Sequence, residues 1–401
     1  MPDIIGSIQG KDLLVGLHKD LPHSEPGVWD DAKNVIFSDN AMQPIPGQYI
    51  ISSSIGGQPI RGIKAASLDN AKSLFYANPS TLTRYTLTGG ATVVGSGYTD
   101  NLWSFQPWSD WMVATNGDKP QVYKGSSFAD LGGFSGNVDG ETKADFLFAI
   151  GEFVFAVRKK KIYWCSRSNV EDWSPTSINS AGSLSPQDLD GEFVGGCVVD
   201  EGTALLCTGN SIHSVNYIGP NSYFGSFKLR KGPGLFGKLA ICEKDHQAYG
   251  FGPNGFFVTD ASQHVFIDDI EGGIHDELFE RLNLDYAWKS IVWHDIFSKQ
   301  IVLWAPLDGA TENSGGYGYN YKDNNWSARD DARTAAEESG IFPWGILGAS
   351  DGSIYAQGLA GQPVNAQDAN LPLLGSGTFT MPFGQSGFGE ISVGGTGEFT
   401  E

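Results

Sequence analysis

Residues 144–166 read ADFLFAIGEFVFAVRKKKIYWCS, and this stretch decides the fold class. Three short apolar and aromatic runs are separated by turn residues, first Gly151-Glu152 and then the basic residues 158–161. Runs of about 5–8 residues of this kind, bounded by turns, are typical of antiparallel strands. The stretch therefore predicts consecutive strands of one sheet.

The same pattern recurs about seven times between Gln58 and Gln357. Clear copies are GGCVVDEGTALLCTGNSIHSVNY (195–217), KLAICEKDHQAYGFGPNGFFVTD (238–260) and KSIVWHDIFSKQIVLWAPL (289–307). Self-similarity at about 40–50 residues, with units made only of strands, indicates a β-propeller rather than a helical solenoid. We therefore expect an all-β fold, a β-propeller of about six to seven blades with an N-terminal extended arm and a short C-terminal tail.

Turn residues set the limits of the repeats. The expected units are 61–87, 102–131, 145–175, 193–219, 236–267, 288–326 and 346–357. Most units begin or end with a bulky aromatic residue, and such rings are expected to fill the seams between blades. These aromatic residues are Tyr85, Tyr123, Trp164, Tyr217, Trp326 and Tyr355.

The chain divides into three regions. Residues 1–57 contain prolines and no clear repeat, which predicts an extended arm packed on the propeller of residues 58–360. Residues 361–401 are rich in Gly and Phe and poor in charge, so we expect a tail that makes subunit contacts or stays mobile. Residues 272–290 have apolar residues at helical spacing and predict a helix, whereas 330–340 (DDARTAAEESG) predict a surface loop with a helical turn.

Charge and composition exclude several classes of function. The chain has 401 residues and a net charge of −20, which repels nucleic acid and anionic membranes. The N-terminus has no basic segment followed by an apolar one, so we expect no signal peptide, and no apolar run is long enough to span a bilayer. The four cysteines form no C-x-x-C pair, which predicts free thiols in a reducing compartment.

No motif for catalysis or metal binding is present. The sequence lacks H-x-x-x-H, G-x-S-x-G and the phosphate-binding glycine motif. Ser350-Asp351-Gly352 matches half of a sialidase Asp box, but the Thr-Trp that should follow is missing. We therefore expect no enzyme, no cofactor and no metal. Paired carboxylates of a glycosidase are the alternative, and the candidates for them are Asp110, Asp145, Asp200, Glu201, Asp245, Asp260 and Asp295.

Arg158, Lys159, Lys160 and Lys161 form the one strong basic run of the chain. The run lies between two predicted strands, so a solvated hairpin turn is one interpretation. The other is an inter-subunit contact with an acidic neighbour, because cations in so acidic a chain complement the rest of its surface.

Several segments, in their order along the chain, resemble tail proteins of short-tailed bacteriophages. The opening string LPHSEPGVWDDAKNVIFSDNAMQPIPGQ (21–48) and WSDWMVATNGDKPQVYKG (108–125) carry the first part of the resemblance. Further segments follow in the family's order: KIYWCSRSNVEDWSP (161–175), LLCTGNSIHSVNYIG (205–219), GPGLFGKLAICEKDHQAYGFGPNGFFVTD (232–260), IHDELFERLN (274–283) and YGYNYKDNNWSAR (317–329). The family comprises β-propeller tail hub or nozzle proteins, among them packaged-DNA stabilisation proteins. Many members carry a larger β-rich platform after the propeller, whereas the weakly patterned residues 361–401 follow it here.

The resemblance implies a structural virion protein, made in the host cytoplasm and located in the phage tail. It implies a ring, a hexamer by family resemblance, around the DNA exit channel, with the portal or head-to-tail adaptor and the tail fibre or spike proteins as partners. Genomic DNA passes through without specific binding. Two other classes stay open: a propeller-type carbohydrate-active enzyme and a receptor-binding tail protein.

Overall fold

Residues 144–166 fold into consecutive strands, as expected. They form β15 (Phe146–Ile150), β16 (Phe153–Arg158) and β17 (Lys161–Trp164), an antiparallel meander in which Phe148 pairs with Phe155 and Val157 with Ile162. The outer strand β18 (Gly182–Leu184) completes a four-stranded sheet. One such sheet cannot bury both of its apolar faces, so it needs a neighbour on each side.

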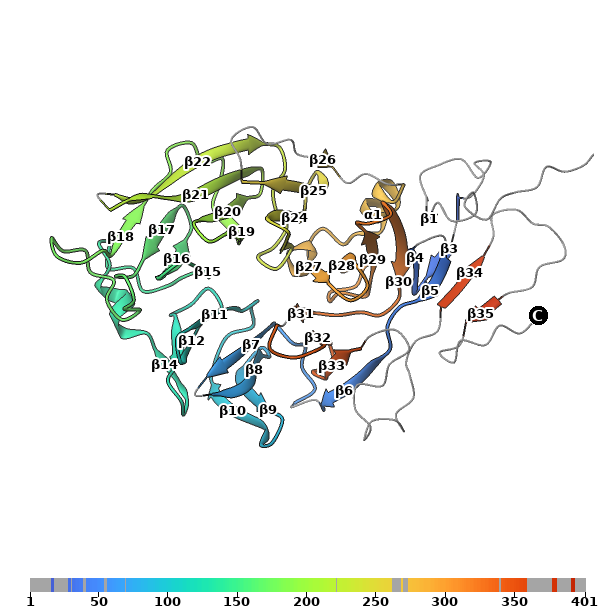
Figure 1. The fold of residues 1–401 in the computed structure, drawn as a ribbon, viewed down its shortest axis with the longest axis horizontal. Helices are drawn as coiled ribbons and strands as arrows, with labels where there is room; N and C mark the ends of the chain where they lie inside the picture. The colour runs from blue at the N-terminus through green and yellow to red at the C-terminus, as the bar shows by residue number, and fades with distance from the viewer. Residues whose placement is uncertain are drawn as a thin grey trace, which may run out of the picture.

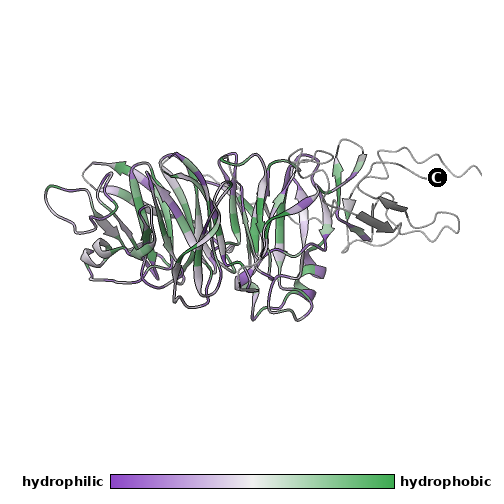
Figure 2. Ribbon diagram, turned by 90° about the horizontal axis from the view of Figure 1, so that it is seen from below, coloured by the Kyte–Doolittle hydropathy of each residue, from purple (hydrophilic) through white to green (hydrophobic). Residues whose placement is uncertain are grey.

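The computed structural model shows seven such sheets around a central axis, and the protein is a seven-bladed β-propeller (Figure 1). Seen from the side, the strands run between two faces formed by loops (Figure 2). The structure describes residues 16–17, 28–29, 31–38, 41–53, 56–68, 70–220, 222–261, 268–269, 273–338, 340–358, 377–380 and 391–393.

Each blade is an antiparallel meander whose first strand lies innermost. The blades, from inner to outer strand, are blade 1, β7 (Gly62–Leu68), β8 (Ala71–Ala77), β9 (Thr81–Thr86) and β10 (Gly90–Ser96); blade 2, β11 (Ser104–Trp108), β12 (Trp111–Thr115), β13 (Gln121–Tyr123) and β14 (Phe128–Asp130); blade 3, β15 to β18; blade 4, β19 (Phe193–Asp200), β20 (Thr203–Thr208), β21 (Ser211–Gly219) and β22 (Tyr223–Lys231); blade 5, β23 (Ile241–Lys244), β24 (Gln247–Gly252), β25 (Gly255–Asp260) and β26 (Asp268–Asp269); blade 6, β27 (Ile291–Asp295), β28 (Gln300–Ala305), β29 (Gly315–Asn320) and β30 (Asn325–Arg329); and blade 7, β31 (Ala335–Glu337), β32 (Gly345–Gly348), β33 (Ile354–Gln357) and β6 (Gln48–Ser52). The α-helix α1 (His275–Arg281) lies in the connection between blades 5 and 6, within the helix expected at 272–290.

Blade 7 is built from both parts of the chain. Its outer strand β6 lies within residues 1–57, where we expected only an arm, and pairs antiparallel with β33. Gln48 anchors it: its side-chain amide donates to Asp331 at 2.8 Å and to Gln357 at 3.0 Å. The boundary that we expected at residue 57 therefore falls between β6 and the rest of blade 7, which β6 completes.

The inner strand of blade 7 corrects a second expectation. Residues 335–337 form β31, not a helical turn, so that prediction was wrong. Ala and Glu favour a helix locally, but β31 pairs with β32 and lies between the inner strands of its neighbouring blades. Tertiary pairing thus overrides local propensity in this short segment.

Aromatic side chains fill most seams between the blades. Tyr123, Trp164 and Trp326 are buried, as expected from their positions at the ends of the repeats. Phe224 packs edge-on against Trp164 and Phe155, joining blade 4 to blade 3. Tyr217 differs: it is 50% exposed, because the β21–β22 hairpin is longer than its neighbours.

Further strands lie beside blade 6. β3 (Asp31–Lys33) pairs with β30 and with β34 (Gly377–Thr380), which in turn pairs with β35 (Ile391–Val393), so this sheet has seven strands. The hairpin β4 (Val35–Ser38) and β5 (Ala41–Pro44) and the pair β1 (Gly16–Leu17) and β2 (Val28–Trp29) lie at the same rim (Figure 1). The side chains of Val35 and Phe37 join the apolar core of blades 5 and 6.

The anchoring of β6 generates a testable expectation. Replacing the buried Gln48 with Ala should lower the free energy of unfolding by about 1–3 kcal/mol, because Asp331 and Gln357 lose a buried partner. Ile50→Ala is the control on the same strand, since Ile50 is 48% exposed and its loss should have little effect. Chemical denaturation of both variants measures the difference. Equal stability of the two variants would show that Gln48 does not hold the ring closed.

Candidate functional site

A cavity of about 500 Å³ lies on the propeller axis, between the inner strands. It is the size of a small-molecule site, so duplex DNA cannot pass through the propeller itself. The residues that carry its charge come from four inner strands or their ends: Lys64, Glu243, His294, Glu337 and Glu338. Lys238, from the connection that enters blade 5, adds one more cation.

Lys238 spans the axis at the end of the cavity where the inner strands begin. Its Nζ donates to the carbonyl oxygen of Leu102 at 3.1 Å and to that of Asp145 at 2.7 Å. These two residues precede the inner strands of blades 2 and 3, so one side chain ties blade 5 to the opposite part of the ring. Gly195 makes room for it, since a Cβ there would lie 2.8 Å from the Lys238 Cα. Burial lowers the pKa of Lys238 to about 8.

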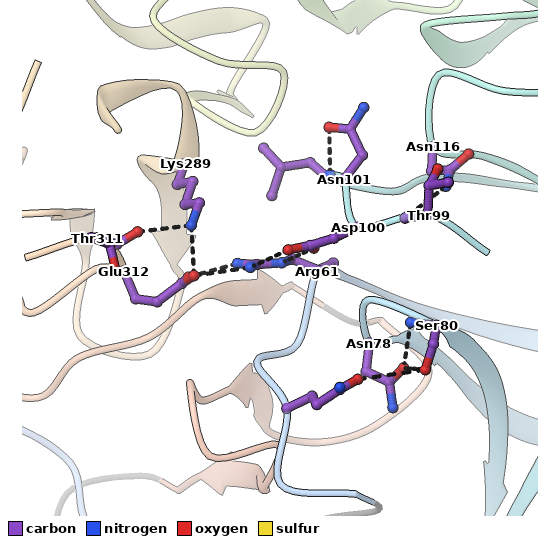
Figure 3. A network of polar contacts seen from close by, with 12 residues as sticks. Arg61, Asn78, Ser80, Thr99, Asp100, Asn101, Asn116, Lys289, Thr311 and Glu312 are labelled. Carbon is purple, nitrogen blue, oxygen red and sulfur yellow. Dashed lines mark hydrogen bonds and ion pairs between the residues drawn. The ribbon is translucent and has the colours of Figure 1, made fainter. Parts of the chain in front are cut away.

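A second set of charges gathers around Arg61, which directly precedes the inner strand of blade 1 (Figure 3). The Arg61 side chain, only 3% exposed, forms one ion pair with Asp100 (Nε–Oδ1 2.7 Å) and another with Glu312 (Nη1–Oε2 2.6 Å). Lys289 donates to Glu312 Oε1 at 2.6 Å and to the Thr311 carbonyl at 2.8 Å. The cluster joins blade 1, the approach to blade 2 and blade 6, and thus ties together three blades that are not all neighbours.

The pKa directions fit this arrangement. Burial by itself would raise the pKa of Glu312, but the hydrogen bonds from Arg61 and Lys289 lower it below its usual range. Burial by itself would lower the pKa of Arg61. The hydrogen bonds from Arg61 to Glu312 and Asp100 outweigh this effect and raise its pKa. Arg61 and Glu312 therefore both stay ionised at neutral pH.

Four of the other charged side chains of the cavity form two ion pairs, whereas Glu243 accepts from the backbone N–H of His246. Lys64 Nζ lies 2.8 Å from Glu337, and His294 Nδ1 lies 2.8 Å from Glu338. His294 thus binds Glu338 rather than its sequence neighbour Asp295. Burial raises the pKa of Glu337, with the charge of Lys64 acting against it. These two pairs cross-link inner strands around the axis.

The thiols offer no nucleophile either. Burial raises the pKa of Cys197 and Cys242 well above the usual value, and that of Cys165 is raised as well. All four cysteines are free, as expected from their spacing.

Four of the seven carboxylates that the sequence offered for a glycosidase have separate structural partners. Asp145 accepts from Arg158 at 2.6 Å, Asp245 pairs with Lys244, and Asp200 accepts from the backbone N–H of Glu201 at 2.8 Å. Asp295 is buried and accepts from two backbone N–H groups of its own turn, and burial raises its pKa. The half Asp box caps a turn as well, because Asp351 accepts from Ser353 N at 2.8 Å.

The basic run forms the turn between β16 and β17, and its four residues differ in surroundings. Arg158 pairs with Asp145 at 2.6 Å, and Lys161 pairs with Asp139 at 2.6 Å. Lys159 has a φ of 53° and its backbone N–H donates to Asp145 at 2.7 Å, while the side chains of Lys159 and Lys160 are exposed. The two ends of the run are thus held within the chain, and its two central lysines point into solvent.

Two features are absent from the described part of the chain: a metal-binding group and a membrane-spanning helix. No group of three or more His, Cys, Asp or Glu side chains there is arranged to hold a metal ion. Within the same residues, no helix is long and apolar enough to cross a membrane.

Sequence reasoning missed the axial charges, although a signal was present. Arg61, Lys238 and Lys289 each stand shortly before the apolar run of an inner strand. A basic residue repeated at the entrance of several blades would have placed three cations at one end of the axis. Their partners Asp100 and Glu312 lie in loops with no pattern to identify them.

The axial ion pairs generate a prediction of stability. Replacing Arg61 with Met should lower the free energy of unfolding by about 3 kcal/mol, because the partly buried Glu312 loses its main partner. Arg167→Met is the control: Arg167 pairs with Glu152 on the surface, and its removal should change stability little. Denaturant titration at neutral pH distinguishes the two. A small effect at Arg61 would mean that the cluster does not tie the blades together.

Lys238 generates a prediction of pH dependence. Its folded pKa of about 8 lies below the unfolded value of roughly 10.4, so the unfolded chain binds more protons between these values. The stability of the wild type relative to Lys238→Met should therefore rise from pH 8 to pH 10, by on the order of 2 kcal/mol. Denaturation of both proteins across this range gives the difference. A difference that stays constant with pH would contradict the burial of a charged Lys238.

Comparison with known proteins adds no relative. No protein-family model matches the chain. No curated protein matches it in sequence either. The resemblance of its segments to phage tail proteins therefore has no support from these two comparisons.

Proposed function

We propose that this protein is a structural component of a bacteriophage tail. In this role several copies form a hub or nozzle ring, six by family resemblance, below the portal or adaptor. The ring surrounds the DNA exit channel, retains the genome and conducts it, and binds tail fibre or spike proteins. The protein has no catalytic activity in this role.

One observation carries the proposal: two distant parts of the resemblance form a single unit. The NVIF string of the opening segment, residues 34–37, lies against the YGYNYKDNNWSAR segment, residues 317–329. Asn320 and Asn325 both donate from their amides to the Phe37 carbonyl, at 2.7 and 3.2 Å, and Asn34 N donates to the Ala328 carbonyl at 2.8 Å. If these two segments resembled the phage family only by chance, there would be no reason for them to contact each other in the fold.

Two further features support a scaffold. The axial cavity is too small for DNA, so a conduit must lie between copies rather than within one. The net charge of −20 gives such a conduit a wall that does not attract phosphate. The ion pairs of Lys64 with Glu337 and of His294 with Glu338 support a structural role over a carbohydrate-active enzyme.

The test is the assembly state of the purified full chain. Negative-stain electron microscopy should show closed rings with a central opening, and sedimentation should give the mass of several copies. The rings should bind duplex DNA negligibly at physiological salt. A protein that stays monomeric at all concentrations, or that binds duplex DNA tightly at this salt, would contradict the proposal.

A further inference from the structure

The tip of the β16–β17 hairpin is a rigid basic projection. The pairs Arg158–Asp145 and Lys161–Asp139, both 2.6 Å, hold its two sides. The Lys159 N–H bond to Asp145 holds its backbone. Lys159 and Lys160 are exposed and form no ion pair within the described residues. Because the turn is anchored, its backbone loses little conformational freedom when the two exposed lysines meet a partner.

A surface groove of about 600 Å³ lies at the end of α1. Leu284 lines this groove, and its side chain is 64% exposed. Glu280 and Asp285 line the groove, are exposed and form no ion pair within the described part of the chain. Arg281 also lines the groove, but its guanidinium already forms ion pairs with Asp308 at 2.7 Å and with Glu277 at 3.3 Å. The groove thus offers free negative charge around an apolar side chain.

Both surfaces belong to the same face of the propeller. The hairpin tip is bonded to Asp145, which directly precedes the inner strand of blade 3. The groove lies on the connection that enters the inner strand of blade 6, where Asp308 N donates to the Arg281 carbonyl at 2.7 Å. β17 and α1 lie on different sides of the ring (Figure 1). A copy can therefore use its tip toward one neighbour and its groove toward another.

We propose that the Lys159–Lys160 tip of one copy docks into the Glu280–Leu284–Asp285 groove of the next copy. This inference rests on the proposed ring. Copies of charge −20 repel one another, so attraction requires that cations of one face acids of the other. The contact joins two different surfaces, and a repeated contact of this kind closes into a ring when each step turns in the same direction.

Charge reversal tests the contact. Lys159→Glu with Lys160→Glu should weaken association at least about tenfold at physiological salt, and Glu280→Lys with Asp285→Lys should do the same. Mixing the two variants should restore association between unlike copies, because each provides the complement of the other. Combining all four changes in one chain should restore the rings.

The control changes the net charge equally at another place. Lys72 and Lys299 are exposed and lie next to the opposite ends of inner strands, so Lys72→Glu with Lys299→Glu should leave assembly unchanged. Circular dichroism and thermal melting check that each variant folds, and sedimentation and electron microscopy report the rings.

The outcomes separate the two proposals. If the tip variant forms rings as the wild type does, or if the four-fold change fails to restore them, the contact is elsewhere and the ring proposal stands. If the control variant loses assembly as well, net charge rather than this contact controls association, and the inference is overturned. If the wild type forms no rings, the proposed function fails and the contact with it.

Discussion

The pairing of β6 with β33 is the constraint on which the rest of the structure depends. A propeller is a circle of sheets, and its first and last blades must be joined by something other than the chain's own continuity. Here Gln48 and Gln357, 309 positions apart, are hydrogen-bonded across that joint. Gln48 also donates to Asp331, and Asp331 forms an ion pair with Arg329. The joint is therefore a buried polar network. Such networks specify one arrangement, because each group loses its partner if the strand shifts.

The axis provides a second, independent tie. Lys238 reaches from blade 5 to carbonyl groups ahead of blades 2 and 3, and Arg61 joins groups of blades 2 and 6. Inner strands have one edge without a strand neighbour, so long cationic side chains at this place satisfy carbonyls and carboxylates that would otherwise face only the cavity. The burial lowers the pKa of Lys238, which is the energetic cost of placing a charge there. This use of the axis favours a rigid scaffold over a ligand-binding enzyme.

A rigid disc with a closed axis directs interactions to its rim and faces. The strands β3, β34 and β35 enlarge blade 6 at one rim, and the β16–β17 turn and the groove beside α1 lie on one face, on different sides of the ring. Because these surfaces differ from one another, they suit contacts between unlike patches, which is the requirement for a ring of more than two copies. The proposals for the ring and for its contact follow from this distribution.

The sequence by itself determined the blade pattern and most seams. Period-two runs between turns predict antiparallel meanders, and the aromatic ends of the repeats predict buried rings such as Tyr123, Trp164 and Trp326, because both signals are local and recur. Only the tertiary structure decided how the circle closes. β6 looks like part of an irregular arm and β31 like a helical turn, since the partners that make them strands lie far away in the chain. The axial cluster escaped sequence reasoning for the same physical reason: Arg61, Glu312 and Lys238 act across the axis, where neighbours in space are not neighbours in sequence.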